Sequence, residues 1–167
     1  MSKSLILFCL CLIVVGCGNP QPPSNTNQRP EVTSTGVVKA TPLAASVTRG
    51  ESTESIVRLK IDDGYHVNAN PPSFPYLIAT EVEITPAQGL SVDLVTYPTG
   101  LIKKFSFAEQ PLAVYEGETD LKVRLSAAKS AQPGEHNLSA KLRVQACDDQ
   151  VCYAPGTMDL TIPVTVK

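Results

Sequence analysis

Apolar and polar residues alternate along most of the chain, from about residue 37 to its end. An alternation with a period of two places one set of side chains against a core and the other in water, which is the pattern of a β-strand. The pattern predicts strands around six sets of apolar positions: Val57, Leu59 and Ile61; Ile78, Val82 and Ile84; Leu90, Val92 and Leu94; Leu121, Val123 and Leu125; Leu138 to Ala146; and Met158 to Val166.

Turn-forming residues separate these runs, among them Asp62-Asp63-Gly64, Pro98-Thr99-Gly100 and Gln132-Pro133-Gly134. No segment shows a convincing helical period. Short strands joined by regular turns are typical of a sandwich or barrel, and we expect an all-β fold, an immunoglobulin-like β-sandwich of two antiparallel sheets. Pro163 has no N–H for a strand ladder, so we expect the last strand to lie at a sheet edge there.

The N-terminus has the features of a signal peptide. Lys3 is followed by an unbroken apolar run from Leu5 to Val15, which is too short for a membrane-spanning helix of about 20 residues. The segment Val14-Val15-Gly16-Cys17 resembles a bacterial lipobox, which implies cleavage before Cys17 and lipid attachment to its sulfur. We therefore expect a lipoprotein signal peptide over residues 1–16; the alternative is an ordinary signal peptide with an incidental cysteine.

Residues 17–36 are expected to form a flexible tether, because they are rich in Pro, Asn, Ser and Thr and carry too little apolar surface to pack. The folded domain is then expected over residues 37–167. The net charge of −2 argues against a nucleic-acid partner, which requires a basic surface. These features predict a lipid-anchored protein of the bacterial envelope, with its domain facing the periplasm or the outside of the cytoplasmic membrane.

Two of the five cysteines are left to form a disulfide. Cys9 and Cys11 would leave with the signal peptide and Cys17 would carry lipid, so Cys147 and Cys152 remain, in an oxidising compartment. The polar residues between them predict a hairpin turn that brings the two thiols together. A loop this short removes little unfolded-state entropy, worth about 2 kcal/mol, so the sequence leaves open whether the bond is structural or redox-active.

Three stretches resemble the N-terminal periplasmic domain of the DsbD-type thiol:disulfide reductases, in order across residues 37–167. They are Asp63 to Ile78; Tyr97 to Gly117; and Gln145 to Pro155, which contains both cysteines and Tyr153 and is the most specific of the three. The resemblance implies an immunoglobulin-like fold. It also implies a cysteine pair that accepts electrons from a thioredoxin-like domain and passes them to periplasmic disulfide proteins.

The same resemblance implies roles for individual residues. Both partners would form mixed disulfides with Cys152, and Cys147 would be the leaving sulfur. A loop with a phenylalanine would cap the pair; Phe107 best matches that residue, and Phe105 is the second candidate. The alternative for Phe107 is a buried core aromatic, and the alternative for Tyr65, which matches a family tyrosine near the cysteines, is an ordinary residue beside a turn.

The chain departs from the family pattern in the spacing and charge of its cysteine segment. The cysteines are one residue closer together than in the best-known pattern, and Asp148 and Asp149 lie between them. Nearby carboxylates disfavour a thiolate, so we expect a raised thiol pKa and slow reaction at neutral pH until a partner docks. His66 is expected to be solvated. No cofactor and no metal site are expected, because His66 and His136 with the cysteines fit no standard ligand spacing.

Two functions are compatible with these features. The first is a thiol:disulfide interchange module, a protein-disulfide reductase that would meet its donor, a thioredoxin-like protein or a transmembrane thiol reductase, in trans. The second is a non-catalytic immunoglobulin-like binding or assembly lipoprotein with a structural disulfide. The redox behaviour of the Cys147–Cys152 pair separates them.

Overall fold

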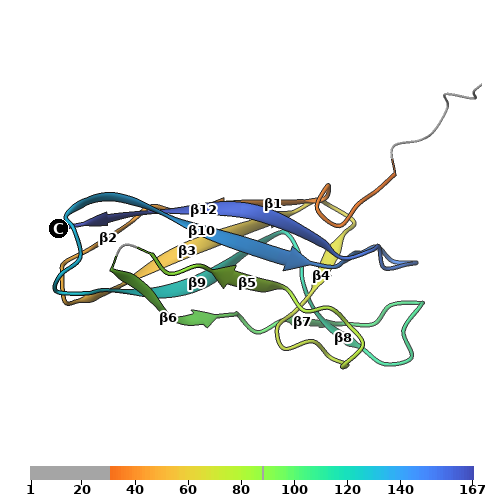
Figure 1. The fold of residues 1–167 in the computed structure, drawn as a ribbon. Coiled ribbons are helices and arrows are strands. Elements are labelled where there is room, and N and C mark those ends of the chain that lie inside the picture. The colour runs from red at the N-terminus through yellow and green to blue at the C-terminus, as the bar shows by residue number, and fades with distance from the viewer. Residues whose placement is uncertain (1–30, 88) are drawn as a thin grey trace, which may run out of the picture. The chain divides into compact units, whose positions relative to one another are not determined.

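Residues 31–167 form one compact unit, and the structure, a computed structural model, describes residues 31–87 and 89–167. Its regular elements are strands, and the described residues contain no helix (Figure 1). No membrane-spanning helix is therefore present among them. The predicted signal peptide, Cys17 and the first part of the predicted tether lie outside the described residues.

The strands form three four-stranded sheets. The first sheet has the order β1-β3-β9-β6, with β1 at Val38–Pro42, β3 at Ser52–Ile61, β9 at Glu118–Ala127 and β6 at Leu90–Thr96. The second has the order β2-β12-β10-β5, with β2 at Ala45–Val47, β12 at Gly156–Val166, β10 at Gly134–Val144 and β5 at Glu81–Ile84. The third has the order β11-β4-β8-β7, with β11 at Ala146–Cys147, β4 at His66–Asn68, β8 at Leu112–Tyr115 and β7 at Leu101–Lys103.

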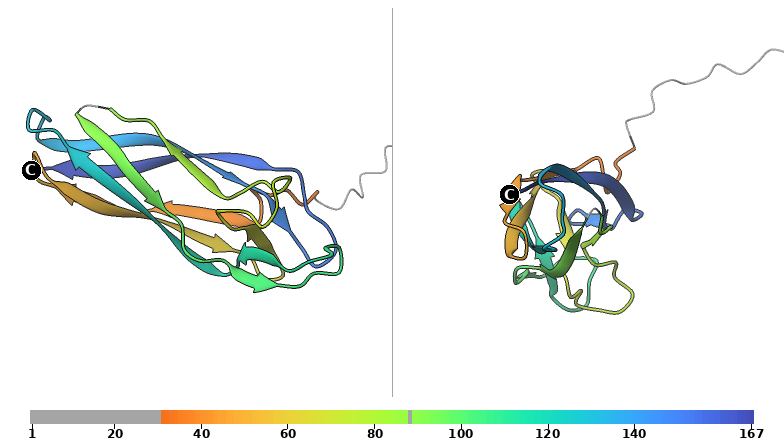
Figure 2. Two further views of the ribbon diagram at one scale, coloured as in Figure 1. Left: turned by 90° about the horizontal axis from the view of Figure 1, so that it is seen from below. Right: turned by 60° about the vertical axis from the view of Figure 1, so that its left-hand side comes forward.

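The first two sheets pack face to face and share one hydrophobic core. In Figure 1, β12 and β10 lie over β3 and β9, and Figure 2 shows the two layers from other sides. Fully buried side chains from both sheets form the core, among them Leu59, Leu121, Leu125, Leu142 and Ile162. Residues of β9 and β10 alternate between buried and exposed, as the sequence pattern predicted. The predicted immunoglobulin-like antiparallel β-sandwich is confirmed, with one parallel pairing, between β2 and β12.

The third sheet was not predicted. Its strands are two to four residues long, which is too short to show a period. All three residues of β4 are buried, so this strand has no polar face to mark it in the sequence. The chain passes from β10 into β11 after one residue, so this sheet continues from one end of the sandwich.

The pattern misplaces Leu94. A β-bulge shifts the register of β6 against β9 between Val92 and Leu94, so Leu94 is 57% exposed, whereas Val95 is partly buried. Pro163 lies where it was expected, at an edge, because β2 pairs with β12 only from Val164 onward.

The folded unit begins before residue 37, the predicted start of the domain. Ser34 is 1% exposed and is hydrogen-bonded to two segments of the domain. Val32 packs against the core. The composition of this segment is that of a tether, but hydrogen bonds through a small polar side chain hold its last residues to the sandwich.

We expect Leu125→Ala to destabilise the fold by about 2–5 kcal/mol, because it leaves a cavity between the two sheets. Leu94→Ala should change stability by no more than about 0.5 kcal/mol, because the bulge turns Leu94 to the surface. Chemical denaturation of both variants measures the two values. A similar loss in both would mean that Leu94 faces the core and that the bulge is absent.

Candidate functional site

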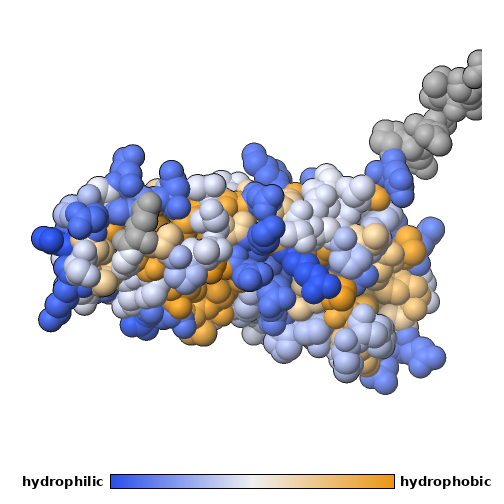
Figure 3. Space-filling model, viewed as in Figure 1, coloured by the Kyte–Doolittle hydropathy of each residue, from blue (hydrophilic) through white to orange (hydrophobic). Residues whose placement is uncertain are grey.

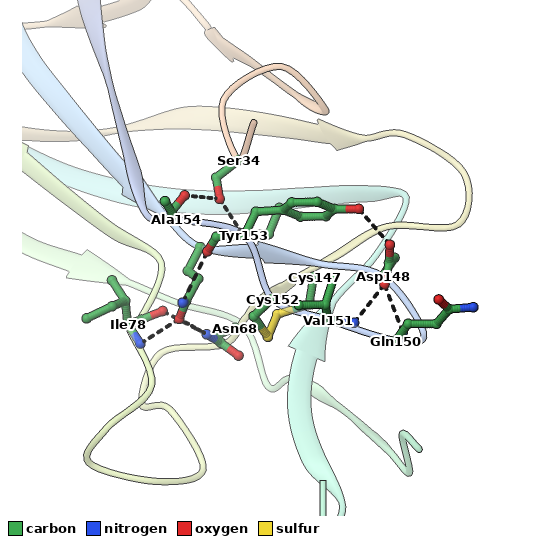
Figure 4. The surroundings of a disulfide bond; sticks show 12 residues. Ser34, Asn68, Ile78, Cys147, Asp148, Gln150, Val151, Cys152, Tyr153 and Ala154 are labelled. Carbon is green, nitrogen blue, oxygen red and sulfur yellow. Dashed lines mark hydrogen bonds between the residues drawn. A yellow bond between two sulfur atoms is a disulfide. The ribbon is translucent and has the colours of Figure 1, made fainter. Parts of the chain in front are cut away.

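The two cysteines lie on opposite arms of a tight hairpin, here called the cysteine hairpin (residues 145–155). Cys147 ends β11 and is bridged to Cys152 across the turn, with Cα atoms 3.9 Å apart and a disulfide between the sulfurs (Figure 4). The backbone N–H of Asp148 donates to the carbonyl oxygen of Val151 at 3.0 Å and closes the turn. The predicted hairpin and its disulfide are both present.

The Asp148 carboxylate organises this turn. Its Oδ1 accepts hydrogen bonds from the backbone N–H groups of Gln150 and Val151, both at 2.8 Å, and its Oδ2 accepts one from the Tyr153 hydroxyl at 2.6 Å (Figure 4). The bond from Tyr153, followed by the two backbone bonds, holds the pKa of Asp148 below its ordinary value. The same carboxylate raises the pKa of Tyr153 to about 12. Asp148 therefore keeps its charge beside the disulfide, and Asp149 is exposed at the tip.

Ser34 anchors the base of the hairpin, a role that the sequence did not indicate. Its hydroxyl donates to the carbonyl oxygen of Ala154 at 2.6 Å and accepts from the N–H of Ala146 at 3.0 Å (Figure 4). The N–H of Tyr153 also donates to the carbonyl oxygen of Ala146 at 2.8 Å. Both arms of the hairpin are thus fixed by hydrogen bonds that do not involve sulfur.

β4 lies alongside the first arm of the hairpin. Val67 pairs with Ala146 and His66 pairs with Cys147 in antiparallel register. Side chains of directly paired residues lie on the same face of a sheet with their Cβ atoms about 4.5–5.5 Å apart, so the His66 and Cys147 side chains leave the sheet side by side.

The expectation that His66 is solvated is wrong. His66 is 1% exposed, and its ring stacks on Phe105 with centroids 4.0 Å apart. Burial lowers the pKa of His66, which keeps the imidazole neutral at neutral pH. Phe105, from a loop distant in sequence, covers the His66 ring. Tyr65 instead lies against Tyr153, with ring centroids 6.1 Å apart.

An amide network, also unmarked in the sequence, lies beside the disulfide. Asn68 Nδ2 donates to the Ile78 carbonyl oxygen at 3.0 Å and to Gln145 Oε1 at 3.1 Å. Gln145 Oε1 also accepts from the N–H of Ile78 at 3.2 Å, and Gln145 Nε2 donates to the Tyr153 carbonyl oxygen at 3.3 Å. The network joins β4, the loop that precedes β5 and both arms of the cysteine hairpin.

The loop between β7 and β8, here called the cap loop (residues 104–111), carries both candidate cap residues. Phe105 is 5% exposed and packs with Leu112 and Val114, so it is a core residue. Phe107 is 37% exposed and its ring stacks on Phe105 with centroids 5.4 Å apart. The Ser106 hydroxyl donates to the Asp149 carbonyl oxygen at 2.7 Å, which ties the cap loop to the tip of the hairpin. Of the two phenylalanines, only Phe107 lines the cavity that also includes Cys152, and its role as a cap stays a prediction.

An open cavity of about 680 Å³ lies between the cap loop and the hairpin. Aromatic and aliphatic side chains line much of it, including Phe74, Tyr76, Leu77, Phe107 and Val151, and Cys152 is part of its wall. Figure 3 shows hydrophobic surface at this end of the molecule. Cys152 is partly exposed, whereas Cys147 is 0% exposed, so a sulfur that approaches from outside reaches Cys152. Among the residues that the structure describes, no three His, Cys, Asp or Glu side chains form a metal-binding group.

Comparison with known proteins identifies one family and several similar solved structures. The model of the N-terminal domain of the thiol:disulfide interchange protein DsbD matches residues 35–163. The N-terminal domain of DsbD from Neisseria meningitidis, in the reduced form, is 19% identical, with a TM-score of 0.49 over 80% of this chain and 90% of that chain. The N-terminal periplasmic domain of ScsB from Proteus mirabilis is 15% identical, with a TM-score of 0.50 over 77% of this chain and 45% of that chain. No curated protein matches the sequence.

We expect Asp148→Asn to be less stable than the wild type at neutral pH, and the difference to shrink in acid. Since the folded-state pKa of Asp148 is lowered, its stabilisation is complete above the ordinary carboxyl pKa of about 4 and is lost as the pH falls through the lowered value. Thermal unfolding at neutral and strongly acidic pH measures this. Asp149→Asn is the matched control in the same turn, and an equal, pH-independent effect of both substitutions would contradict the assignment.

Proposed function

The chain belongs to the family of the N-terminal domain of the thiol:disulfide interchange protein DsbD, and from this premise we propose that Cys147 and Cys152 form a thiol:disulfide interchange centre. The pair accepts electrons from a thioredoxin-like partner or a transmembrane thiol reductase and passes them to disulfide-containing proteins, as a protein-disulfide reductase. The observation that carries this proposal is the unequal exposure of the two cysteines, with Cys152 at the wall of an apolar cavity and Cys147 fully buried.

That inequality sets the order of the chemistry. A partner thiolate attacks Sγ of Cys152, the bond between the two cysteines breaks as the new S–S bond forms, and Cys147 leaves as a thiolate that takes up a proton. A second thiol of the partner then attacks the mixed disulfide, so the partner leaves oxidised and the pair is left as two thiols. The reduced Cys152 attacks the disulfide of the next protein, and the electrons move on.

The hydrogen bonds of the hairpin argue against a purely structural disulfide. Asp148 closes the turn and Ser34 fixes both arms without any contribution from sulfur. A covalent bond across so short a loop adds little to a turn that is already held in this way. In the alternative function, a non-catalytic binding or assembly module, the disulfide would only hold a turn that hydrogen bonds already hold.

The cavity beside Cys152 suits an extended apolar segment that flanks a partner cysteine. Tyr76 and Val151 are strongly exposed at its walls, and exposed apolar groups of this kind mark contact surfaces. Phe107, on the cap loop, lines the same cavity as Cys152, so a segment that docks there would displace it and open the path to the sulfur. The carboxylates of Asp148 and Asp149 would raise the thiol pKa of the reduced pair, so that exchange awaits a docked partner.

We place this domain in the periplasm, held at a membrane by lipid on Cys17. The lipobox-like segment supports the anchor, and the similarity to the N-terminal periplasmic domain of ScsB supports the compartment. An oxidising compartment is required for the resting disulfide to persist. Donor and acceptor would then be proteins of the same compartment.

We expect Cys147→Ser to accumulate a mixed disulfide with a thioredoxin-like protein, because Cys152 can attack but the resolving sulfur of the pair is gone. Cys152→Ser should accumulate little, because Cys147 is buried. Non-reducing electrophoresis and mass spectrometry identify the adducts. Equal trapping by both variants would contradict the assigned order, and a wild-type disulfide with a potential below about −300 mV would favour the structural alternative.

Phe107→Ala should increase the rate at which glutathione opens the disulfide several-fold, because it removes a partly exposed ring that lines the same cavity as Cys152. Ile102→Ala is the control, since Ile102 is an equally apolar, exposed residue on β7 that does not line the cavity. Stopped-flow or quenched alkylation measures the rates. An unchanged rate for Phe107→Ala, or the same increase in both variants, would rule out the cap.

A further inference from the structure

Two buried polar atoms near the disulfide lack hydrogen-bond partners. Across residues 31–87 and 89–167, the buried side-chain nitrogen and oxygen atoms in this condition are His66 Nε2 and Asn68 Oδ1. His66 is 1% exposed and Asn68 is 0% exposed. An unpaired polar atom in such surroundings is costly, and native proteins retain few of them, so a pair beside one reactive group calls for an explanation.

Both atoms project from the same face of β4, the face that meets Cys147. His66 is the direct cross-strand partner of Cys147, and Asn68, two residues further along the strand, points to the same side. In Figure 4 the Asn68 amide lies beside the disulfide, with its nitrogen turned toward Ile78 and its oxygen on the side of the sulfur atoms. The two unpaired atoms therefore belong to side chains on the face of β4 that carries the cross-strand partner of Cys147.

The orientation of the Asn68 amide is determined by its neighbours. The backbone N–H of Ile78 needs an acceptor, and Gln145 Oε1 supplies it, so the Gln145 amide cannot be flipped. Gln145 Oε1 and the Ile78 carbonyl oxygen both then face Asn68 and require its Nδ2. Oδ1 is left to point at the disulfide, where it can act only as an acceptor.

His66 is held just as firmly. Its ring is stacked on Phe105 at 4.0 Å and lies parallel to Phe107 at 6.4 Å. The charged groups that act on the ring are Glu116, Lys103, Asp148 and Asp149, but burial outweighs them and lowers the pKa of His66. In the tautomer with its proton on Nδ1, the neutral ring presents Nε2 as a second acceptor.

A disulfide offers these acceptors nothing, because it carries no hydrogen. Reduction places one proton on each sulfur and creates two S–H donors at the same place. We propose that His66 Nε2 and Asn68 Oδ1 are the hydrogen-bond acceptors for the thiols of the reduced Cys147–Cys152 pair, so that the site is complete only when the pair is reduced. This inference rests on the proposed interchange function.

Reduction of the Cys147–Cys152 pair takes two electrons and two protons from a donor. Two thiols of a donor lose two electrons and two protons and become a disulfide, while the Cys147–Cys152 bond breaks and each sulfur gains one electron and one proton. The new S–H groups then satisfy the two acceptors. Reduction therefore relieves an existing cost and adds hydrogen bonds, and both effects favour the dithiol and make the pair easier to reduce.

The test is the redox equilibrium of the purified protein against glutathione, in the wild type and two variants. His66→Phe keeps an aromatic ring on Phe105 but removes Nε2. Asn68→Leu keeps the volume but removes Oδ1, together with the two hydrogen bonds that Nδ2 donates. Each variant should move the equilibrium about tenfold toward the disulfide, which corresponds to a potential about 30 mV lower. Unchanged equilibria in both would overturn the proposal.

Thr80→Val is the matched control for a loosened site. The Thr80 hydroxyl is buried and donates to the Asn68 carbonyl oxygen at 2.7 Å, so its loss disturbs the same strand without touching either acceptor. It should lower thermal stability equally in both redox states and leave the glutathione equilibrium in place. A shift equal to that of Asn68→Leu would assign the effect to general loosening and overturn the proposal.

A measurement on the wild type covers the case in which a variant does not fold. The ¹⁵N chemical shift of His66 Nε2 should change on reduction, because the nitrogen acquires a donor, whereas the shifts of His136, distant from the disulfide, should not. Equal His66 spectra in both redox states would refute the acceptor role. Failure of the interchange function would give a different result. The protein would not exchange with a thioredoxin-like protein, but its glutathione equilibrium would still respond to the two substitutions.

Discussion

The short antiparallel pairing of β4 with β11 is the interaction on which the site depends. It is two residues long, yet it places His66 opposite Cys147 and brings the cysteine hairpin against the third sheet. β4 also pairs with β8, and β8 pairs with β7. The cap loop that joins β7 to β8 therefore lies at the same end of the molecule as the cysteine hairpin. Without this pairing, the cysteine hairpin would lose its backbone connection to the third sheet.

The chemistry of the pair follows from what covers each sulfur. Cys147 is buried where β11 pairs with β4, and Cys152 lies at the wall of an apolar cavity. Thiol exchange requires in-line access to one sulfur and departure of the other, and the burial of one cysteine decides which is which. The sandwich core contributes rigidity to this arrangement rather than reactive groups.

Polar groups around the disulfide divide into two sets with different effects. Asp148, Tyr153 and Ser34 hold the hairpin in shape through bonds that are the same whichever state the sulfurs are in. His66 and Asn68 present acceptors that have no partner beside the closed disulfide. The first set holds the shape of the turn without the covalent bond, and the second, on our proposal, is satisfied when the bond opens.

The sequence by itself determined the sandwich and the cysteine pair, because both depend on local information. Period-two alternation is a property of each strand alone, and the two cysteines flank a polar turn of their own hairpin. It also indicated Phe107 and Phe105, although only packing separates the partly exposed ring from the buried one.

Only the tertiary structure decided the surroundings of the disulfide. The burial of His66, the amide network of Asn68 and Gln145, the anchor at Ser34 and the exposure of Leu94 all come from segments distant in sequence or from a bulge. A strand of three buried residues shows no alternation of apolar and polar positions. A small polar residue in a proline-rich segment has the composition expected of a linker. Their roles appear only when the partner strand, with its donors and acceptors, is in place.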